Sequence, residues 1–356
     1  MYLTPISVLP YLVDRGLLAI DELVEGGVAV AQHPDRSVLV VRREGASGFV
    51  VKQPSPLLSR QLMRLDREAT IYELARSRAG ASEFGRLLPD LVAYDTGVHA
   101  LVIERLTDAE TLDAFHANGR PGMDDVAGRV GAAVALCHTT FAPVDGWPPS
   151  ALFPHQPPWV LSIHGGEFDD ELGAAARAVV DVVRDEPAFH APLDRLREEW
   201  RSDCLIHGDM RWSNVLVGAP DRPGRVWVVD WEGADVGDPA WDLAAVVQSY
   251  LAHRLTSRHG RGSAADADAA GWWESARESI RVLWLSYVAA RGLDDGPALA
   301  LRERVVGFVG ARLVQTAFEM MRPAERLAPV AVTLLQVSQN VFADPDAAAA
   351  DLLGLA

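Results

Sequence analysis

Short apolar runs alternate with polar loops between residues 204 and 244, and this alternation is the strongest constraint on the fold. The run CLI precedes HGDMRWSN, the run VLV follows it, and the later run VWVV ends just before Asp230. Runs this short, bounded by Gly, Asp and Asn, are typical of strands joined by turns. We therefore expect three strands here, which hold the polar loop residues on a rigid frame.

The polar residues of this segment suit phosphoryl transfer. Asp209, on the first loop, can accept a hydroxyl proton or orient a hydroxyl group. Asn214 and Asp230 supply oxygen atoms, which Mg²⁺ prefers as ligands. Phosphoryl transfer depends mainly on positioning and charge neutralisation, which such a set can provide. A hairpin with polar turns would explain a lone His-Gly-Asp tripeptide, but the full set, which continues into GDPAWDLA, is more specific.

The remaining patterns predict an α+β chain with two lobes. Three β-rich runs, VAVAQ, SVLVVRR and GFVVKQ, indicate an antiparallel meander, and LVAYDTG and HALVIERL are two further strand candidates. An amphipathic helix is expected over residues 59–79 between these groups. We therefore predict a small antiparallel-sheet lobe over residues 1–106. A large, mainly helical lobe should follow over 107–356, with helices near 271–291, 297–321 and 325–342.

HGDMRWSN followed by VVDWEGADVGDPAWDLA resembles the aminoglycoside phosphotransferase and choline kinase family, which has the protein-kinase-like fold. The resemblance extends from about residue 28 to the C-terminal helices. It implies a bilobal kinase-like fold with ATP and Mg²⁺ as cofactors. It also implies that Asp209 is the catalytic base or hydroxyl-positioning group, and that Asn214 and Asp230 hold Mg²⁺. The positions that it assigns to support of the site are His207, Arg211, Asp238 and Asp242. For the last two, capping of a helix at AWDLAAVV is an equally compatible role.

Lys52 is the only lysine of the chain, beside 32 arginines. The resemblance matches it to the third-strand lysine that contacts the α- and β-phosphates of ATP and pairs with a helix glutamate. Arginine, a wide planar fork, does not replace the compact lysine charge at such a site. Glu68 and Glu73 both border the apolar face of the 59–79 helix, so helical geometry leaves the pairing open. The R-E-A pattern of the family favours Glu68.

The resemblance also assigns the adenine contacts. VIERL matches the connector between the lobes, so the Glu104 carbonyl and the Leu106 amide are expected to hold adenine. The loop at residues 32–37 departs from protein kinases because it lacks glycine, so Arg36 or Ser37 would have to replace backbone contacts to phosphate. Asp230-Trp231-Glu232 stands where protein kinases have Asp-Phe-Gly, which argues against a regulated protein kinase.

The acceptor is the least determined part of the prediction. The net charge of −16 argues against nucleic-acid binding and fits either a cationic acceptor or ordinary solubility. An acidic run, HGGEFDDEL, could bind ammonium groups or could be a solvated face; its carboxylates are Glu167, Asp169, Asp170 and Glu171. The Pro-rich segment 147–159, with Trp147 and Trp159, could instead serve an extended peptide acceptor.

Three functional hypotheses follow. The first is a kinase of a small natural product or antibiotic, and the second is a Ser/Thr kinase of a precursor peptide in lanthipeptide-type biosynthesis. The third is a nucleotide-binding pseudokinase that serves as a partner subunit, which the presence of the lysine, the aspartate and both metal ligands disfavours. We expect no membrane span and no signal peptide, and two distant cysteines fit a reducing cytoplasm. The sequence does not determine the oligomeric state.

Overall fold

The computed structural model describes residues 2–33, 37–54, 59–77, 82–141, 152–168, 172–218, 224–260 and 269–355. The chain divides into two compact units. The first contains the described parts of Met1–Glu110, Pro149–Phe153 and Leu216–Ala234, and the second those of Thr111–Pro148, Pro154–Val215 and Asp235–Ala356. The first unit thus runs past the predicted boundary at Leu106 and also includes a later segment, which carries Asp230.

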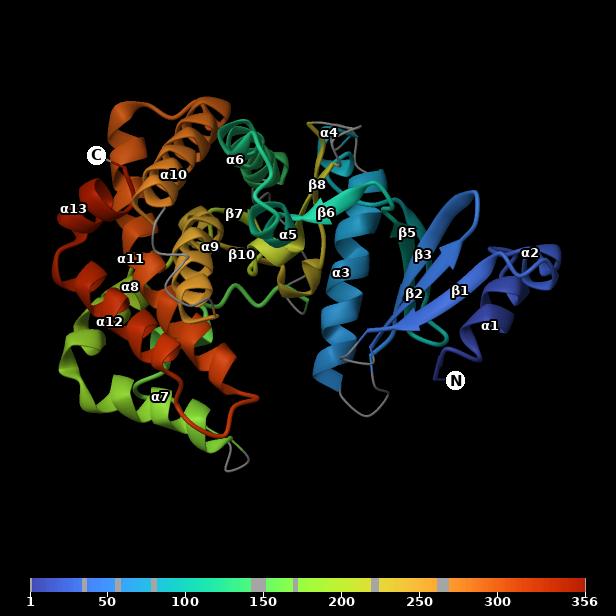
Figure 1. The fold of residues 1–356 in the computed structure, drawn as a ribbon, viewed down its shortest axis with the longest axis horizontal. Coiled ribbons are helices and arrows are strands. Elements are labelled where there is room, and N and C mark those ends of the chain that lie inside the picture. Colours follow the sequence, from blue (N-terminus) through green and yellow to red (C-terminus); the bar gives the residue numbers. More distant parts are fainter. Residues whose placement is uncertain are drawn as a thin grey trace. The chain divides into compact units, whose positions relative to one another are not determined.

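A five-stranded antiparallel sheet forms the centre of the first unit (Figure 1). Its strands are β1 (Val28–Gln32), β2 (Val38–Arg43), β3 (Ala46–Lys52), β4 (Leu91–Asp95) and β5 (Ala100–Arg105), in the order β1-β2-β3-β5-β4. Gly45, with a φ of 70°, makes the turn between β2 and β3, a left-handed conformation that glycine adopts at little cost. The five strands predicted from the sequence are therefore confirmed.

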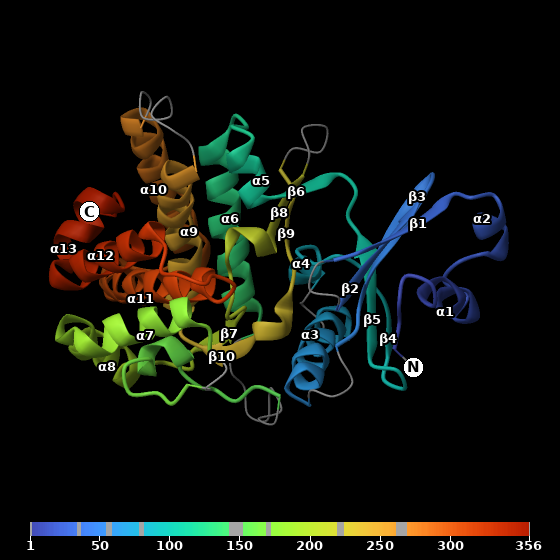
Figure 2. The ribbon, with the colours of Figure 1, turned by 60° about the horizontal axis from the view of Figure 1, so that its bottom comes forward.

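The two faces of this sheet are covered by different helices (Figures 1 and 2). On one face, α1 (Val8–Asp14) packs over alternate strand residues such as Val41 and Val51 in a closed apolar core, and α2 (Ile20–Val24) follows it. On the other face lies α3 (Ser59–Ser77), followed by the short α4 (Ser82–Gly85). Successive strand residues point to opposite faces, so Lys52, next to Val51, points toward α3.

The segment around HGDMRWSN has the three strands that its pattern predicts. β7 (Cys204–Ile206) precedes the loop, and β8 (Val215–Gly218) and β9 (Val226–Val228) follow it, with β8 in the centre of a small sheet of order β6-β8-β9. The edge strand β6 is Ala109–Thr111. A further short strand, β10 (Asp235–Gly237), pairs antiparallel with β7. Its three residues carry no strand pattern, so the sequence did not predict it.

The second unit is mainly helical. Its helices are α5 (Leu112–Ala117), α6 (Met123–Thr140), α7 (Ala174–Asp185), α8 (His190–Glu198), α9 (Pro239–Gly260), α10 (Ala269–Arg291), α11 (Asp295–Met321), α12 (Pro329–Ala343) and the short α13 (Pro345–Ala347). α6 packs on α10, and α11 packs on α9 and α12. A Cβ atom at Gly131 of α6 would collide with the Leu283 carbonyl of α10, so glycine allows this close packing. Among the helices that the structure describes, none has the length and apolar character of a membrane span.

Candidate active site

Lys52 forms an ion-pair cluster in the first unit, in which Glu68 is buried and the Asp230 side chain is 41% exposed. Its Nζ atom lies 2.7 Å from Glu68 Oε1 and 2.7 Å from Asp230 Oδ1. The Glu68 side chain is 1% exposed, whereas Glu73, the other glutamate that α3 offered, is exposed. The end of β3 and the middle of α3 thus bring together the lysine and Glu68.

The Lys52 ammonium group lies between two carboxylates. Burial by itself would lower the pKa of Lys52, but the carboxylates of Glu68 and Asp230 outweigh it and raise that pKa, so the lysine stays protonated. Burial raises the pKa of Glu68, although the charge of Lys52 acts in the opposite direction. Carboxylate oxygens such as those of Asp230 are ligands that suit a divalent cation.

Asp230 also has an unusual backbone conformation. Its φ is 68° and its ψ is 54°, in the left-handed region that few residues other than glycine enter. The segment after it is tied to α3, because Arg67 donates to the Glu232 carbonyl at 3.1 Å. Trp231 packs edge-on against Phe84, with ring centroids 5.4 Å apart. A conformation of this kind, held by its surroundings, is characteristic of functional positions.

The second unit contains the loop with Asp209. The Asp209 amide donates to His207 Nδ1 at 3.2 Å, and the Asp209 carbonyl accepts from the Arg211 amide at 2.8 Å. Asn214 donates through Nδ2 to the same carbonyl at 2.9 Å. Asn214 Nδ2 also lies 3.4 Å from Asp209 Oδ2. The amide nitrogen of Asn214 is therefore turned toward Asp209, and its oxygen is the end that can take a cation.

Asp242 holds this loop from α9. Its carboxylate accepts the His207 amide at 2.6 Å and the Gly208 amide at 3.0 Å. His138 Nε2 lies 3.2 Å from the same carboxylate, and His138 Nδ1 lies 3.0 Å from the Tyr287 hydroxyl. Burial would raise the pKa of Asp242, but the hydrogen bonds from His138 and from the His207 amide outweigh it and lower that pKa. The Asp242 carboxylate is therefore stable in this buried place as an anion.

Asp238 has a different role from Asp242. It directly precedes α9, and its Oδ1 atom accepts the Ala240 amide at 2.9 Å, as a capping residue does. Its Oδ2 atom accepts from Arg304 Nε at 2.9 Å. Of the two roles that the sequence left open, capping therefore describes Asp238, and support of the loop describes Asp242.

Two arginines bind the carboxylate of Asp209 through the same oxygen. Arg211 Nε lies 2.9 Å and Arg312 Nη1 lies 3.4 Å from Asp209 Oδ1. Glu319 holds Arg211 from the other side, at 2.9 Å. Arg312 stacks on the Trp241 ring, 3.7 Å from its centroid, and donates to the Gly208 carbonyl at 2.8 Å. Burial lowers the pKa of Arg312 to about 10, so it is still protonated at neutral pH.

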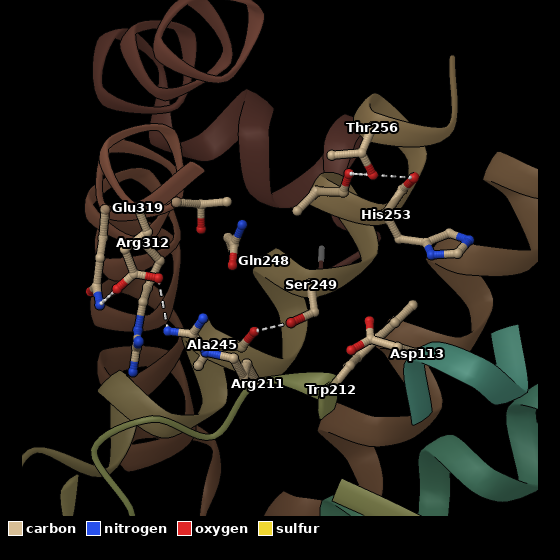
Figure 3. Close-up of a pocket in the computed structure, with 13 residues that line it drawn as sticks. Asp113, Arg211, Trp212, Ala245, Gln248, Ser249, His253, Thr256, Arg312 and Glu319 are labelled. Atoms are coloured by element: carbon tan, nitrogen blue, oxygen red, sulfur yellow. Dashed lines mark hydrogen bonds and ion pairs between the residues drawn. The ribbon is translucent and has the colours of Figure 1, made fainter. Parts of the chain in front are cut away.

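A pocket of about 190 Å³ adjoins these arginines (Figure 3). One wall comes from α9 and another from α11, whose contributing residues recur at helical spacing. The lining residues are Asp113, Arg211, Trp212, Ala245, Gln248, Ser249, Ala252, His253, Thr256, Arg312, Gln315, Thr316 and Glu319. Arg211 and Trp212 belong to the loop of Asp209, so the pocket reaches that loop.

The remaining predicted residues are not among those that line this pocket, or they lie outside the described residues. Glu104 lies in β5 opposite Phe49, where Ser47 donates to its side chain, and Leu106 directly follows that strand. Glu167 is exposed and does not line the pocket. The other predicted acceptor contacts, Asp169, Asp170 and Glu171, lie outside the described residues. The same holds for residues 34–36 of the predicted phosphate loop.

Sequence reasoning missed the contribution of α11. Arg312, Gln315 and Glu319 are polar residues at spacings of three and four in a helix that is otherwise largely apolar. Such a polar stripe on a buried helix is a usable signal for a site. No cluster of three or more His, Cys, Asp or Glu side chains suited to a metal occurs within the described residues.

Solved structures of known kinases share this fold. The structure of choline kinase LicA from Streptococcus pneumoniae superposes with a TM-score of 0.51 at 16% identity, over 94% of this chain and 99% of that one. The gentamicin–APH(2")-IIa complex superposes with a TM-score of 0.50 at 12% identity, over 96% and 97% of the two chains. At these identities the likeness concerns the fold, and it confirms the predicted kinase-like architecture.

The family model of the phosphotransferase enzyme family matches residues 31–283. The chain therefore belongs to this family, whose kinases use ATP and phosphorylate hydroxyl acceptors. Viomycin phosphotransferase from Streptomyces vinaceus is 44% identical over 50 residues, which span 14% of this chain and 17% of that protein. The predicted family and enzyme class are thus confirmed.

Proposed function

We propose that this chain transfers the γ-phosphoryl group of Mg-ATP to an alcohol hydroxyl of a small natural product or antibiotic. The observation that carries the proposal is the place of Asp209. Its carboxylate is held by Arg211 and Arg312, both of which line the 190 Å³ pocket. A hydroxyl compound in this pocket would lie beside an aspartate that can orient it.

The nucleotide contacts follow from the same proposal. Lys52, held by Glu68, would bind the α- and β-phosphates, and the backbone of Glu104 and Leu106 would bind adenine. Asp230 and Asn214 would hold Mg²⁺, because both offer oxygen ligands. Bound Mg²⁺ supplies charge neutralisation at the transferring phosphate.

The hydrogen bonds of Asp209 bear on its chemical role. Two guanidinium groups share Oδ1, and Asn214 approaches Oδ2 only at 3.4 Å, so Oδ2 is the oxygen to which an acceptor hydroxyl would donate. In the reaction, a bond forms between the hydroxyl oxygen and Pγ, the bond from Pγ to the β–γ bridging oxygen breaks, and ADP leaves. Asp209 would orient the hydroxyl first and accept its proton late, as a loose transition state requires.

The second candidate function is the Ser/Thr kinase of a precursor peptide. The third candidate, a pseudokinase, is disfavoured because Lys52, Asp209, Asn214 and Asp230 are all present.

Acceptor mass after incubation with Mg-ATP tests the proposal. One pool would contain aminoglycosides and viomycin, and a second pool would contain peptides rich in Ser and Thr. The Asp209→Asn variant is the matched control, because asparagine keeps an oxygen that can accept from the arginines. A gain of one phosphate in one pool, absent with the variant, would support the function and give the acceptor class. ATP binding without transfer to any acceptor would favour the pseudokinase.

A further inference from the structure

The glycine that precedes Asp209 needs outside contacts to fix its conformation. Gly208 has a φ of 79°, in the left-handed region that glycine enters at little cost. Because glycine has no side chain, the peptide group between Gly208 and Asp209 can rotate more freely than one that follows another residue. Rotation of this peptide group would turn the Asp209 carboxylate away from its place. The atoms that hold the Gly208 carbonyl therefore control the direction of Asp209.

Two side chains from neighbouring helices hold this carbonyl. Arg312 Nη2 of α11 donates to it at 2.8 Å, and Trp241 Nε1 of α9 donates to it at 2.9 Å. The Gly208 amide is held separately, because Asp242 of α9 accepts it at 3.0 Å. Both peptide groups that adjoin Gly208 are thus fixed by helices of the second unit.

Arg312 also reaches the side chain of Asp209. Its Nη1 atom lies 3.4 Å from Asp209 Oδ1, so one planar group contacts both the carboxylate and the carbonyl that precedes it. The same guanidinium group stacks on the Trp241 ring, 3.7 Å from its centroid, and the Arg312 side chain is 4% exposed. One edge and one face of the guanidinium fork are therefore held. This arrangement suits arginine, and the point charge of lysine cannot reproduce it.

Arg211 cannot have the same effect on the loop. Its Nε atom lies 2.9 Å from Asp209 Oδ1, but Arg211 belongs to the loop itself and its side chain is 40% exposed. Figure 3 shows that Arg312, by contrast, extends from α11. A residue that moves with the loop does not fix the loop against the helices. A buried ion pair gains little net stability, so the main effect expected of Arg312 is on the geometry of the loop.

We propose that Arg312 is a positioning residue for phosphoryl transfer, which fixes the Gly208–Asp209 peptide group and so directs Asp209 Oδ2 toward the acceptor hydroxyl. Trp241 supports Arg312 as the surface on which the guanidinium group lies. This inference rests on the proposed function, in which Asp209 orients that hydroxyl. A displacement of about 1 Å at a reacting group can cost about 10²-fold in rate. Loss of the fork should therefore lower kcat and leave nucleotide binding unchanged.

A charge-conserving substitution tests the role of the fork. Arg312→Lys keeps the charge but loses one of the two contacts, so kcat should fall about tenfold or more, with the KM for Mg-ATP unchanged. The assay is release of ADP from Mg-ATP by the full chain, in one series with viomycin as acceptor and in another with water alone. Arg302→Lys is the matched control, because Arg302 lies on the same helix and donates to the Leu355 carbonyl at 2.7 Å. The kcat of this control should equal that of the wild type.

Chemical rescue separates the shape of the guanidinium group from its charge. Arg312 lines the pocket, so Arg312→Ala leaves a space beside the pocket that a small cation can enter. Millimolar ethylguanidinium should raise the kcat of this variant severalfold, whereas ethylammonium, which has the same charge but no fork, should not. Amide hydrogen exchange gives a readout that needs no acceptor. Exchange at residues 207–211 should rise in Arg312→Ala, and ethylguanidinium should reverse the rise.

Three results would overturn the inference. They are a wild-type kcat in Arg312→Lys, equal rescue of Arg312→Ala by ethylammonium, and unchanged exchange at residues 207–211 in Arg312→Ala. Should Arg312→Ala fail to fold in urea unfolding, the kcat and the exchange of Arg312→Lys decide the inference. A wild-type chain that releases no ADP, beside exchange that rises in the variant and is reversed by ethylguanidinium, would contradict the proposed function and still support the positioning of the loop. The two failures are therefore distinguishable.

Discussion

Removal of the Asp242 carboxylate should destabilise the loop that carries Asp209. Asp242→Ala leaves three donors without their acceptor, namely the amides of His207 and Gly208 and the Nε2 atom of His138. Each buried donor left unpaired costs about 1–3 kcal/mol. Because these groups share one acceptor their costs do not add fully, so we expect a loss of about 3–6 kcal/mol in the free energy of unfolding.

Such a loss is large beside the total stability of a typical domain, about 5–15 kcal/mol. Alanine is a good helix former, so the substitution does not itself disfavour α9. The Asp242→Asn variant serves for comparison, because it should lose less stability than Asp242→Ala. It keeps one oxygen acceptor and adds an NH₂ group that faces donors, so we expect an intermediate loss of about 2–4 kcal/mol.

Urea unfolding measures the loss, and amide hydrogen exchange shows where it occurs. Exchange should rise first in the peptide that contains His207 and Gly208, because their amides lose their acceptor. Phosphoryl transfer should fall with it, since the same loop carries Asp209. A loss below about 1 kcal/mol for Asp242→Ala, with unchanged exchange at those two amides, would refute the view that Asp242 holds the loop.

Three further predictions concern other parts of the site. Lys52→Arg should preserve the fold and lower turnover by about 10²-fold or more, because the guanidinium fork does not reproduce the ammonium contacts; near wild-type rates in a coupled ADP assay would contradict the role of Lys52. Glu319→Gln should lower kcat about tenfold by loosening Arg211, with ATP affinity unchanged, and a change in ATP affinity alone would point elsewhere. Burial lowers the pKa of His116 to about 3, so the folded state holds this ring neutral. Stability should therefore fall by about 1.4 kcal/mol per pH unit as pH drops below about 6.5 toward that value; His116→Phe should remove this slope in urea unfolding followed against pH, and an unaltered slope would assign it to other groups.

The strands and the candidate site residues could be predicted from local sequence patterns. The apolar runs of β2, β3 and β5 predict strands, but the covered face, from which Lys52 points away while Val51 points into it, is seen only in the structure. The loop between β7 and β8 could be recognised because its residues are adjacent in the chain. β10 could not, because three residues without a strand pattern become a strand only by pairing with β7.

The residues that contact Asp209 and Arg211 could not be predicted from local sequence patterns. Arg312 and Glu319 lie more than a hundred residues beyond Asp209 and Arg211, and their contacts exist only once α11 packs on α9. The acidic run that includes Glu167 was predicted as an acceptor contact from charge alone. Glu167 does not line the described pocket, whose lining carboxylates are those of Asp113 and Glu319.

The amino-acid sequence by itself determined three strands of the segment that contains Asp209, the family, and the candidate roles of Lys52, Asp209, Asn214 and Asp230. These features depend on neighbouring residues and on side-chain periodicity, which a single chain displays directly. Only the tertiary structure decided that Glu68 pairs with Lys52, that Asp242 supports the loop while Asp238 caps α9, and which charges face the pocket. The physical reason is that burial and ion pairing depend on which helix faces meet, and distant segments set that geometry together.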